Sequence, residues 1–241
     1  MPQLGAVVVG AGPSGAATAL ALSRAGHRVT VLDRARFPRD KACGEGLMPP
    51  GVGALRRLGV LDAVLATHPP RIRGVTYTHG PGTAVAYAPF PAPPEGGERW
   101  GLGVRRTVFD VVLADALRHA TGVTLAEGVR ATGLVRDGSG LVIGVATSEG
   151  HLGADAVVAA DGLHSTVRAA AGWSGAAAGE GRYGLAGHWR LDVREVDRIT
   201  VTFAAEQEWY QAPVGPDLLL VSTLGGRASI GATARSYEAA A

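Results

Sequence analysis

The sequence predicts an α/β fold, in which strands and helices alternate at first and a strand-rich antiparallel sheet follows. Three observations predict this arrangement. Residues 6–9 and 28–32 are short apolar runs that flank an alanine-rich segment of helical length. Residues 107–119 carry apolar side chains at helical spacing. From 182 to 233, successive strand-like runs are typical of an antiparallel sheet.

The N-terminal segment has the pattern of a complete βαβ unit. It contains, in order, an apolar strand at 6–9, a glycine turn, a helix at 13–25 and a strand at 28–32. Gly26 ends the helix, and Asp33 follows the second strand. Residues 34–50 hold prolines, glycines and alternating charges. This predicts a long loop, which a compact domain rarely contains unless the loop contacts a ligand.

The later elements follow from periodicity and turn residues. A short helix is expected at 51–58, and a strand pair at 71–79 and 83–90 is joined by a turn that begins at His79. The proline-rich stretch 89–97 is the expected crossing point between two structural regions. The other predicted strands are 123–126, 129–135, 141–147, a buried strand at 154–160, and 182–191, 199–204, 209–213, 218–224 and 228–233.

Composition narrows the class of protein. The 241 residues are 46% hydrophobic and 18% charged, which predicts a packed globular chain. The formal net charge of only +2 argues against nucleic acid or an anionic membrane as the partner. Cys43 is the only cysteine, so a disulfide within the chain and a cysteine-cluster metal site are excluded, and a cytoplasmic location is expected. No run reaches the roughly 18 apolar residues of a membrane-spanning helix.

The first chemical motif is the glycine turn between the first strand and the first helix. Residues 10–15 match G-x-G-x-x-G, in which the glycines allow a tight turn, close approach of a pyrophosphate, and close packing of helix on strand. Asp33 stands 23 residues after Gly10, where an acidic side chain accepts hydrogen bonds from ribose hydroxyls and repels a 2′-phosphate. An ordinary strand-to-helix turn is the alternative. The context favours FAD or NAD as the ligand at this turn.

A second motif follows the predicted strand at 154–160. Asp161 and Gly162 form a turn before a helix that carries Ser165 and Arg168. The aspartate can accept a hydrogen bond from a cofactor hydroxyl, and the glycine leaves room beside it. The alternative is an ordinary capped helix with surface polar residues.

Together these motifs resemble those of the FAD-dependent aromatic hydroxylase and geranylgeranyl reductase superfamily. The resemblance rests on the glycine turn, the Asp-Gly-x-x-Ser-x-x-Arg segment at 161–168 and the Arg-Thr-Val-Phe-Asp segment at 106–110. It covers the chain well from about residue 6 to 168, and beyond that only as a strand-rich continuation. The resemblance implies a Rossmann-like FAD-binding domain, a strand-rich substrate domain, and NADH or NADPH as a transient reductant.

The candidate cofactor-binding residues come from the motifs and from this resemblance. They are Gly10, Gly12, Pro13, Ser14, Gly15, Asp33, Arg34, Lys41, Gly44, Arg106, Val129, Asp161, Gly162, Ser165 and Arg168. The 34–47 segment is similar to the loop beside the flavin ring in the reductase branch, which makes Cys43 and Glu45 possible flavin neighbours. For Cys43 the alternative is a small buried residue. No catalytic side chain is assigned, because the flavin performs the chemistry. No histidine or cysteine spacing indicates a metal site.

The sequence departs from the superfamily near its end. No Gly-Asp dipeptide occurs, although members carry one whose aspartate contacts FAD, so the fold is expected to be C-terminally incomplete. The residues at 208–213 keep little of the aromatic segment that the reductase branch places over the flavin. The expected FAD-binding domain is 1–70 with 98–178, and the partial substrate domain is 71–97 with 179–241.

The resulting hypothesis is a cytoplasmic FAD-dependent oxidoreductase, namely an NAD(P)H-dependent flavin monooxygenase that acts on a small organic or natural-product substrate. One alternative is a geranylgeranyl-reductase-like enzyme that reduces an isoprenoid double bond. Another is a dinucleotide-binding fragment without catalysis, and an NAD dehydrogenase is a third. Bound flavin would exclude the dehydrogenase.

Overall fold

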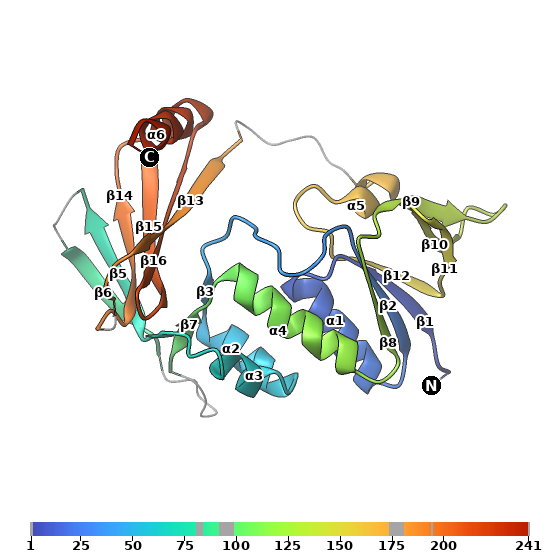
Figure 1. Ribbon diagram of the computed structural model, residues 1–241. Helices are drawn as coiled ribbons and strands as arrows, with labels where there is room; N and C mark the ends of the chain where they lie inside the picture. Colours follow the sequence, from blue (N-terminus) through green and yellow to red (C-terminus); the bar gives the residue numbers. More distant parts are fainter. Residues whose placement is uncertain (1, 81–83, 92–98, 174–180, 194, 241) are drawn as a thin grey trace. The chain divides into compact units, whose positions relative to one another are not determined.

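The computed structural model describes residues 2–80, 84–91, 99–173, 181–193 and 195–240 (Figure 1). The chain divides into two compact units. The first contains Met1–Arg39 and Thr107–Ala176, and the second contains Asp40–Arg106 and Ala177–Ala241. The described residues 40–70 and 99–106 thus belong to the second unit, whereas the sequence pattern predicts them as part of the FAD-binding domain. Which ligand each unit binds stays a prediction at this stage.

The first unit is built on a four-stranded parallel sheet, as the βαβ pattern predicts. Its strand order is β12-β1-β2-β8. The strands are β1 (Gly5–Val9), β2 (Arg28–Asp33), β8 (Val123–Glu127) and β12 (Ala156–Ala159). Val8 and Val31 in the two central strands have no exposed surface. A parallel sheet needs cover on both faces, and both faces are covered here.

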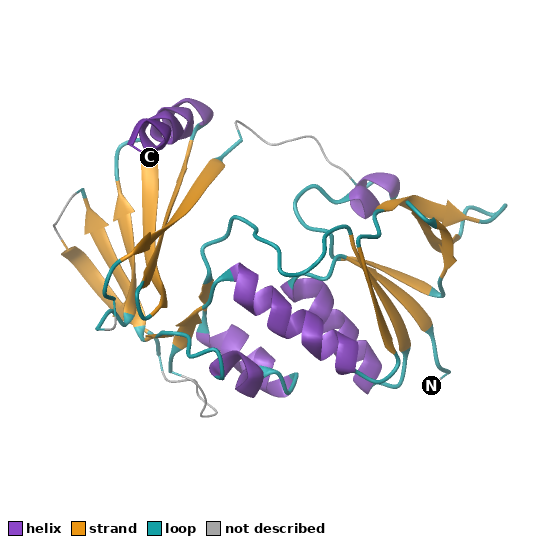
Figure 2. Ribbon diagram, in the orientation of Figure 1, coloured by secondary structure: helices purple, strands orange, loops and turns teal. Residues whose placement is uncertain are grey.

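Helices cover one face of this sheet, and a small second sheet covers the other (Figures 1 and 2). The helices are α1 (Pro13–Arg24) and α4 (Arg106–His119). On the opposite face are the antiparallel strands β9 (Ala131–Arg136), β10 (Val142–Thr147) and β11 (Gly150–Gly153), with the short helix α5 (Thr166–Ala170). A hydrophobic cluster that includes Val7, Leu32 and Val145 joins the two sheets.

The second unit contains a six-stranded sheet in the order β13-β16-β15-β14-β5-β6. Its strands are β5 (Gly74–His79), β6 (Ala84–Pro89), β13 (Tyr183–Arg190), β14 (Arg198–Phe203), β15 (Gln207–Gly215) and β16 (Leu218–Gly225). Neighbouring strands are antiparallel except β14 and β5, which pair in parallel. The predicted antiparallel sheet and the hairpin of β5 with β6 are therefore confirmed.

A second, three-stranded sheet completes this unit, with helices beside it. Its strands are β3 (Gly46–Leu47), β4 (Arg71–Ile72) and β7 (Gly101–Gly103), in the order β3-β7-β4. The helices are α2 (Pro49–Arg57), α3 (Leu61–Leu65) and, at the end of the chain, α6 (Arg227–Ala240). A Cβ at Gly103 would stand 1.7 Å from the carbonyl oxygen of Pro213, so β7 can approach β15 only with glycine at this position.

Several expectations from the sequence were wrong in detail. Residues 228–233 form part of α6 rather than a strand, and Gln207 of β15 holds this helix by hydrogen bonds to Ser229 and Thr233. The predicted buried strand at 154–160 is the edge strand β12, half-exposed along its length. The loop at 34–50 contains β3 and ends in α2, which begins with Pro49. Most of the predicted crossing point at 89–97 lies outside the described residues.

Glu127 at the end of β8 holds two other parts of the first unit in place. Its carboxylate accepts a hydrogen bond of 2.8 Å from the Phe37 N–H in the loop after β2, and it pairs with Arg118 of α4. Burial acts to raise the pKa of Glu127, but the Phe37 N–H and the Arg118 guanidinium outweigh it and lower the pKa below its ordinary value. A glutamate with a lowered pKa in the folded state stabilises the fold above its unfolded-state pKa, and this contribution disappears as the pH falls through the folded-state value.

We therefore expect the free energy of unfolding to fall as the pH drops below about 4, and Glu127→Gln to weaken this dependence. Urea denaturation at a series of pH values measures it. Glu149→Gln, at an exposed turn of the same unit, is the control and should leave the profile unchanged. A Glu127→Gln profile that is parallel to that of the wild type down to about pH 2 would show that the glutamate does not carry this dependence.

Candidate cofactor site

The glycine turn after β1 has a conformation that only glycine allows. Gly10 has a φ of +101°, and a Cβ there would stand 2.4 Å from the carbonyl oxygen of Ala160. At Gly15 a Cβ would stand 1.8 Å from the carbonyl oxygen of Gly10. Helix α1 therefore packs directly against the turn, and the turn packs against the end of β12. The tight turn and the close packing of helix on strand are two of the three roles that the G-x-G-x-x-G pattern predicts for its glycines.

Helix α1 begins at this turn with an N-terminus that is open to an anion. Gly12 is the N-cap residue, no side chain caps the helix, and the first turn holds no acidic residue. Pro13 and Ser14 are exposed. The first backbone N–H groups of a helix lack partners within the helix and carry partial positive charge, so they bind phosphate groups well. The described residues at this end thus fit the pyrophosphate of a dinucleotide.

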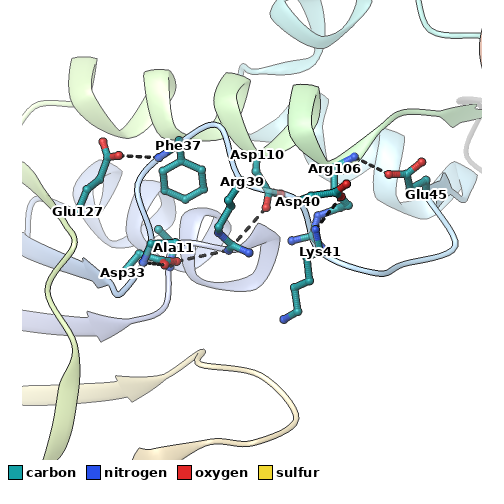
Figure 3. Close-up of polar contacts among 11 residues, drawn as sticks. Ala11, Asp33, Phe37, Arg39, Asp40, Lys41, Glu45, Arg106, Asp110 and Glu127 are labelled. Atoms are coloured by element: carbon teal, nitrogen blue, oxygen red, sulfur yellow. Dashed lines mark hydrogen bonds and ion pairs between the residues drawn. The ribbon is translucent and has the colours of Figure 1, made fainter. Parts of the chain in front are cut away.

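Asp33 connects the end of β2 to the glycine turn (Figure 3). One carboxylate oxygen accepts a 2.9 Å hydrogen bond from the Ala11 N–H, and the other accepts one of 2.9 Å from the Ala35 N–H. The residue is 7% exposed. A carboxylate has about four acceptor positions, so capacity is left for a ribose hydroxyl. Asp33 holds the turn in shape and can also contact a ligand.

Arg39 was not predicted as a site residue, but the structure places it beside Asp33. Its guanidinium lies 3.4 Å from the Asp33 carboxylate and 3.6 Å from that of Asp110, which is fully buried in α4 (Figure 3). The cation reduces repulsion between two carboxylates that share one region of low exposure. The only sequence signal was its position in a charged loop six residues after Asp33. Arg34, which was predicted, is exposed.

The Asp-Gly motif forms a closed turn at the start of α5. The Asp161 carboxylate accepts hydrogen bonds from the Ser165 hydroxyl at 2.5 Å and from the N–H groups of Thr166 and Val167. Ser165 is the N-cap and accepts from the Arg168 N–H. The motif therefore has the capped-helix geometry of the alternative interpretation. It also adjoins the glycine turn, because a Cβ at Gly10 would stand 3.0 Å from the Asp161 Cα.

The remaining residues of the first unit have more peripheral positions. Gly162 has a φ of +85°, which the turn after Asp161 requires, and Arg168 donates a hydrogen bond to the Leu163 carbonyl. Val129 is buried in the cluster between the two sheets, and its N–H donates to the Asp33 carbonyl oxygen at 3.0 Å. The Val129 backbone thus helps to fix the backbone of Asp33.

The flavin-neighbour candidates lie in the second unit. Lys41, Cys43 and Gly44 are exposed, so the alternative of a buried cysteine is wrong. Glu45 is buried, and its carboxylate accepts a 2.9 Å hydrogen bond from the Arg106 N–H (Figure 3). Its other oxygen lies 2.7 Å from Nε2 of His188 in β13. Arg106 is itself buried. The sequence named Glu45 and Arg106 separately, and nothing in their spacing predicted this contact.

The structure thus brings one group of the predicted residues together around the turn after β1, and a second group lies beside it; both remain candidate site residues. The first group is Gly10, Gly12, Pro13, Ser14, Gly15 and Asp33, and the second is Asp161, Gly162, Ser165 and Arg168. Comparison with known proteins identifies the family. The sequence pattern of the FAD binding domain matches residues 3–223. The chain belongs to this family. Its cofactor is FAD, and the uncapped helix and the glycine turn fit that cofactor.

Relatives of this FAD-binding domain have several named activities. The menaquinone reductase of Mycolicibacterium smegmatis is 37% identical over 168 residues, which are 67% of this chain and 38% of the relative. The squalene epoxidase erg1 of Schizosaccharomyces pombe is 36% identical over 143 residues, which are 59% of this chain and 31% of the relative. The chain thus spans less than two fifths of the length of these curated relatives.

A solved structure agrees with the fold. The myxobacterial chondrochloren halogenase CndH, described as an FAD-dependent halogenase, has a TM-score of 0.78 and 26% identity, over 99% of this chain and 56% of that one. The described residues of both units contain no helix of the length and apolar character needed to span a membrane.

Proposed function

We propose that this FAD-binding domain is part of a flavin monooxygenase that acts on a small organic or natural-product molecule, with NADH or NADPH as a transient reductant. The observation that carries the FAD-binding part of the proposal is the open N-terminus of α1 at a turn where Asp33 is fixed by the Ala11 N–H. Membership of the FAD binding domain family supports this part as well, and the relative named squalene epoxidase supports the monooxygenase activity.

The residues of the first unit bind and orient the cofactor in this proposal. The first-turn N–H groups of α1 hold the pyrophosphate, because the helix end supplies both donors and partial positive charge. Asp33 accepts from the adenosine ribose, and Asp161 fixes the neighbouring turn through Ser165. Bound FAD supplies electron transfer and oxygen activation, while the protein supplies position and exclusion of water.

A reductase is the second candidate, because the relative with 37% identity is named menaquinone reductase. It shares the same demands on the FAD site and differs in what accepts the electrons. The purified chain, titrated with FAD and followed by visible absorption, gives the first test. A purified protein that is colourless, and remains colourless after incubation with FAD and removal of the free FAD, would contradict FAD binding and favour the non-catalytic fragment. For the protein with bound flavin, oxygen-dependent NADH oxidation that rises with an added organic substrate and yields an oxygenated product supports the monooxygenase. Sustained NADH oxidation without oxygen, with a quinone added as the electron acceptor, supports the reductase.

A single substitution tests the ribose contact. Asp33→Ala removes an acceptor that carries negative charge, and hydrogen bonds to charged groups contribute about 1.5 to 3 kcal/mol, so FAD affinity should fall about 10- to 150-fold. Isothermal titration measures it. Asp155→Ala is a matched control, because Asp155 accepts the Gly5 N–H at the opposite end of β1. Equal FAD affinities for the Asp33 variant and the wild type would remove Asp33 from the site.

A further inference from the structure

Glu45 in the second unit is a buried acidic side chain held in a conformation that favours glycine. Its side chain is 2% exposed, and its φ is +49°. Gly44 and Gly46 flank it, yet the strained position between them carries a glutamate. Its carbonyl oxygen accepts the Val104 N–H at 2.9 Å, which fixes the backbone. Strain and burial of this kind persist where the surroundings determine the conformation and often accompany function.

The carboxylate of Glu45 determines which nitrogen of His188 carries a proton. One oxygen accepts from the Arg106 N–H, and the other lies 2.7 Å from Nε2 of His188. A carboxylate only accepts hydrogen bonds, so Nε2 carries a hydrogen, and the neutral form of the imidazole is the Nε2–H tautomer. Nδ1 then has a lone pair and no hydrogen. All of these contacts lie within the second unit.

Nδ1 of His188 is available to a ligand. The His188 side chain is 19% exposed, and within the described residues its one hydrogen-bond partner is Glu45. Its register partner across the sheet is Leu220 of β16, and the pairs two positions along are Ala186 with Ser222 and Arg190 with Leu218. These neighbours are small or apolar, apart from the Ser222 hydroxyl and the Arg190 guanidinium, which pairs with Asp217. The arrangement is that of a base oriented by a second group, which is common in acid–base catalysis.

We propose that His188 accepts the hydroxyl proton of the small-molecule substrate and that Glu45 is its positioning residue. The inference rests on the proposed function, since it names the group that meets the substrate in the strand-rich unit. The O–H bond of a phenol-type hydroxyl breaks, and an N–H bond forms at Nδ1. The products are an oxyanion and an imidazolium whose positive charge lies beside the Glu45 carboxylate. Removal of the proton makes an aromatic ring more electron-rich, which suits attack by an oxygen electrophile.

Glu45→Gln tests the positioning role, because it should reverse the hydrogen bond without removing it. The carbonyl oxygen of the new amide must accept from the Arg106 N–H, so the NH2 group of the amide faces Nε2 of His188. The imidazole then accepts at Nε2, and its proton moves to Nδ1. Ring-nitrogen shifts of the ¹⁵N-histidine-labelled full chain measure this tautomer. Glu208→Gln, which changes a carboxylate bonded to Tyr210 elsewhere on the sheet, should leave His188 in the wild-type tautomer.

The substrate role is tested with 4-nitrophenol, whose visible absorption reports ionisation of its hydroxyl. Binding to the wild-type chain at fixed pH should increase the ionised fraction and perturb the Nδ1 shift of His188. Glu45→Gln and His188→Asn should both lose the ionisation, because neither variant offers Nδ1 as an acceptor. His188→Asn also removes the imidazole hydrogen bond and should bind about tenfold more weakly. Circular dichroism checks that both variants fold, and if His188→Asn does not, Glu45→Gln decides.

Three results would overturn the proposal: a wild-type His188 with its proton on Nδ1, nitrophenol ionisation that survives Glu45→Gln, or no nitrophenol binding by the wild type. FAD titration of the same wild-type sample reports separately on the proposed function. A chain that binds FAD but shows any of these three results contradicts only the role of His188. A chain that does not bind FAD contradicts the proposed function itself.

Discussion

Gly15→Ala is expected to destabilise the first unit severely and to abolish FAD binding. The new Cβ would stand 1.8 Å from the carbonyl oxygen of Gly10 and 3.2 Å from the Ala160 Cβ. Both neighbours belong to the packed end of the sheet, so α1 would have to move away from β1. Overpacking of a core costs about 1 to 3 kcal/mol and sometimes more, and a clash with backbone belongs at the upper end. Urea denaturation measures the loss.

Gly133→Ala is the matched control for this prediction. Gly133 lies in β9 of the same unit, and a Cβ there would have no neighbour within 4 Å. The free energy of unfolding of the Gly133→Ala variant should therefore differ little from that of the wild type. If Gly15→Ala were as stable as Gly133→Ala and still bound FAD, the close packing of α1 on the glycine turn would not be needed for the fold.

Gly12→Val is expected to prevent FAD binding while the chain still folds. Gly12 is the N-cap of α1 and is half-buried, next to the exposed Pro13 and Ser14. A branched side chain there would stand over the helix end where a pyrophosphate meets backbone N–H groups. Loss of two charge-assisted hydrogen bonds, at about 1.5 to 3 kcal/mol each, weakens FAD affinity by roughly a hundredfold or more. FAD titration by visible absorption measures the loss.

Ala25→Val tests whether any valine in α1 has this effect. Ala25 is the exposed C-cap residue at the other end of the helix. This variant should bind FAD like the wild type. A Gly12→Val chain with an ordinary circular dichroism spectrum and full yellow colour would show that the pyrophosphate does not approach Gly12.

The sequence predicted the elements whose pattern is local. The βαβ unit follows from the apolar runs and from Gly10 and Gly26, because each of these signals acts within a few residues. Helix α6 was mistaken for a strand because residues 228–233 are small and weakly amphipathic, and the contact of Gln207 with Ser229 that holds the helix spans 22 residues. Tertiary contact of this kind has no local signature.

In the candidate site, too, the residues of a local motif were predictable and the contacts between distant segments were not. The glycine turn and Asp33 were predictable because the motif and its spacing are a linear pattern. The contact of Arg39 with Asp110 and that of Glu45 with His188 were not. His188 is 143 residues from Glu45, and only the return of β13 to the second unit brings the two together. The exposure of Cys43 likewise depends on the path of the loop rather than on the residue type.

The way the chain alternates between the two units has a consequence for how the protein forms. The chain passes from one unit to the other after Arg39, after Arg106 and after Ala176. During synthesis, the hairpin of β5 with β6 emerges early, but its parallel partner β14 begins only at Arg198. Because this pairing is distant in sequence, the strand-rich unit should form late and slowly. The described strands of the first unit are all present once β12 has emerged, so this unit can fold before β14 is synthesised. Until β14 pairs with it, β5 has an open strand edge. The chain is therefore most prone to aggregate at this point of its synthesis.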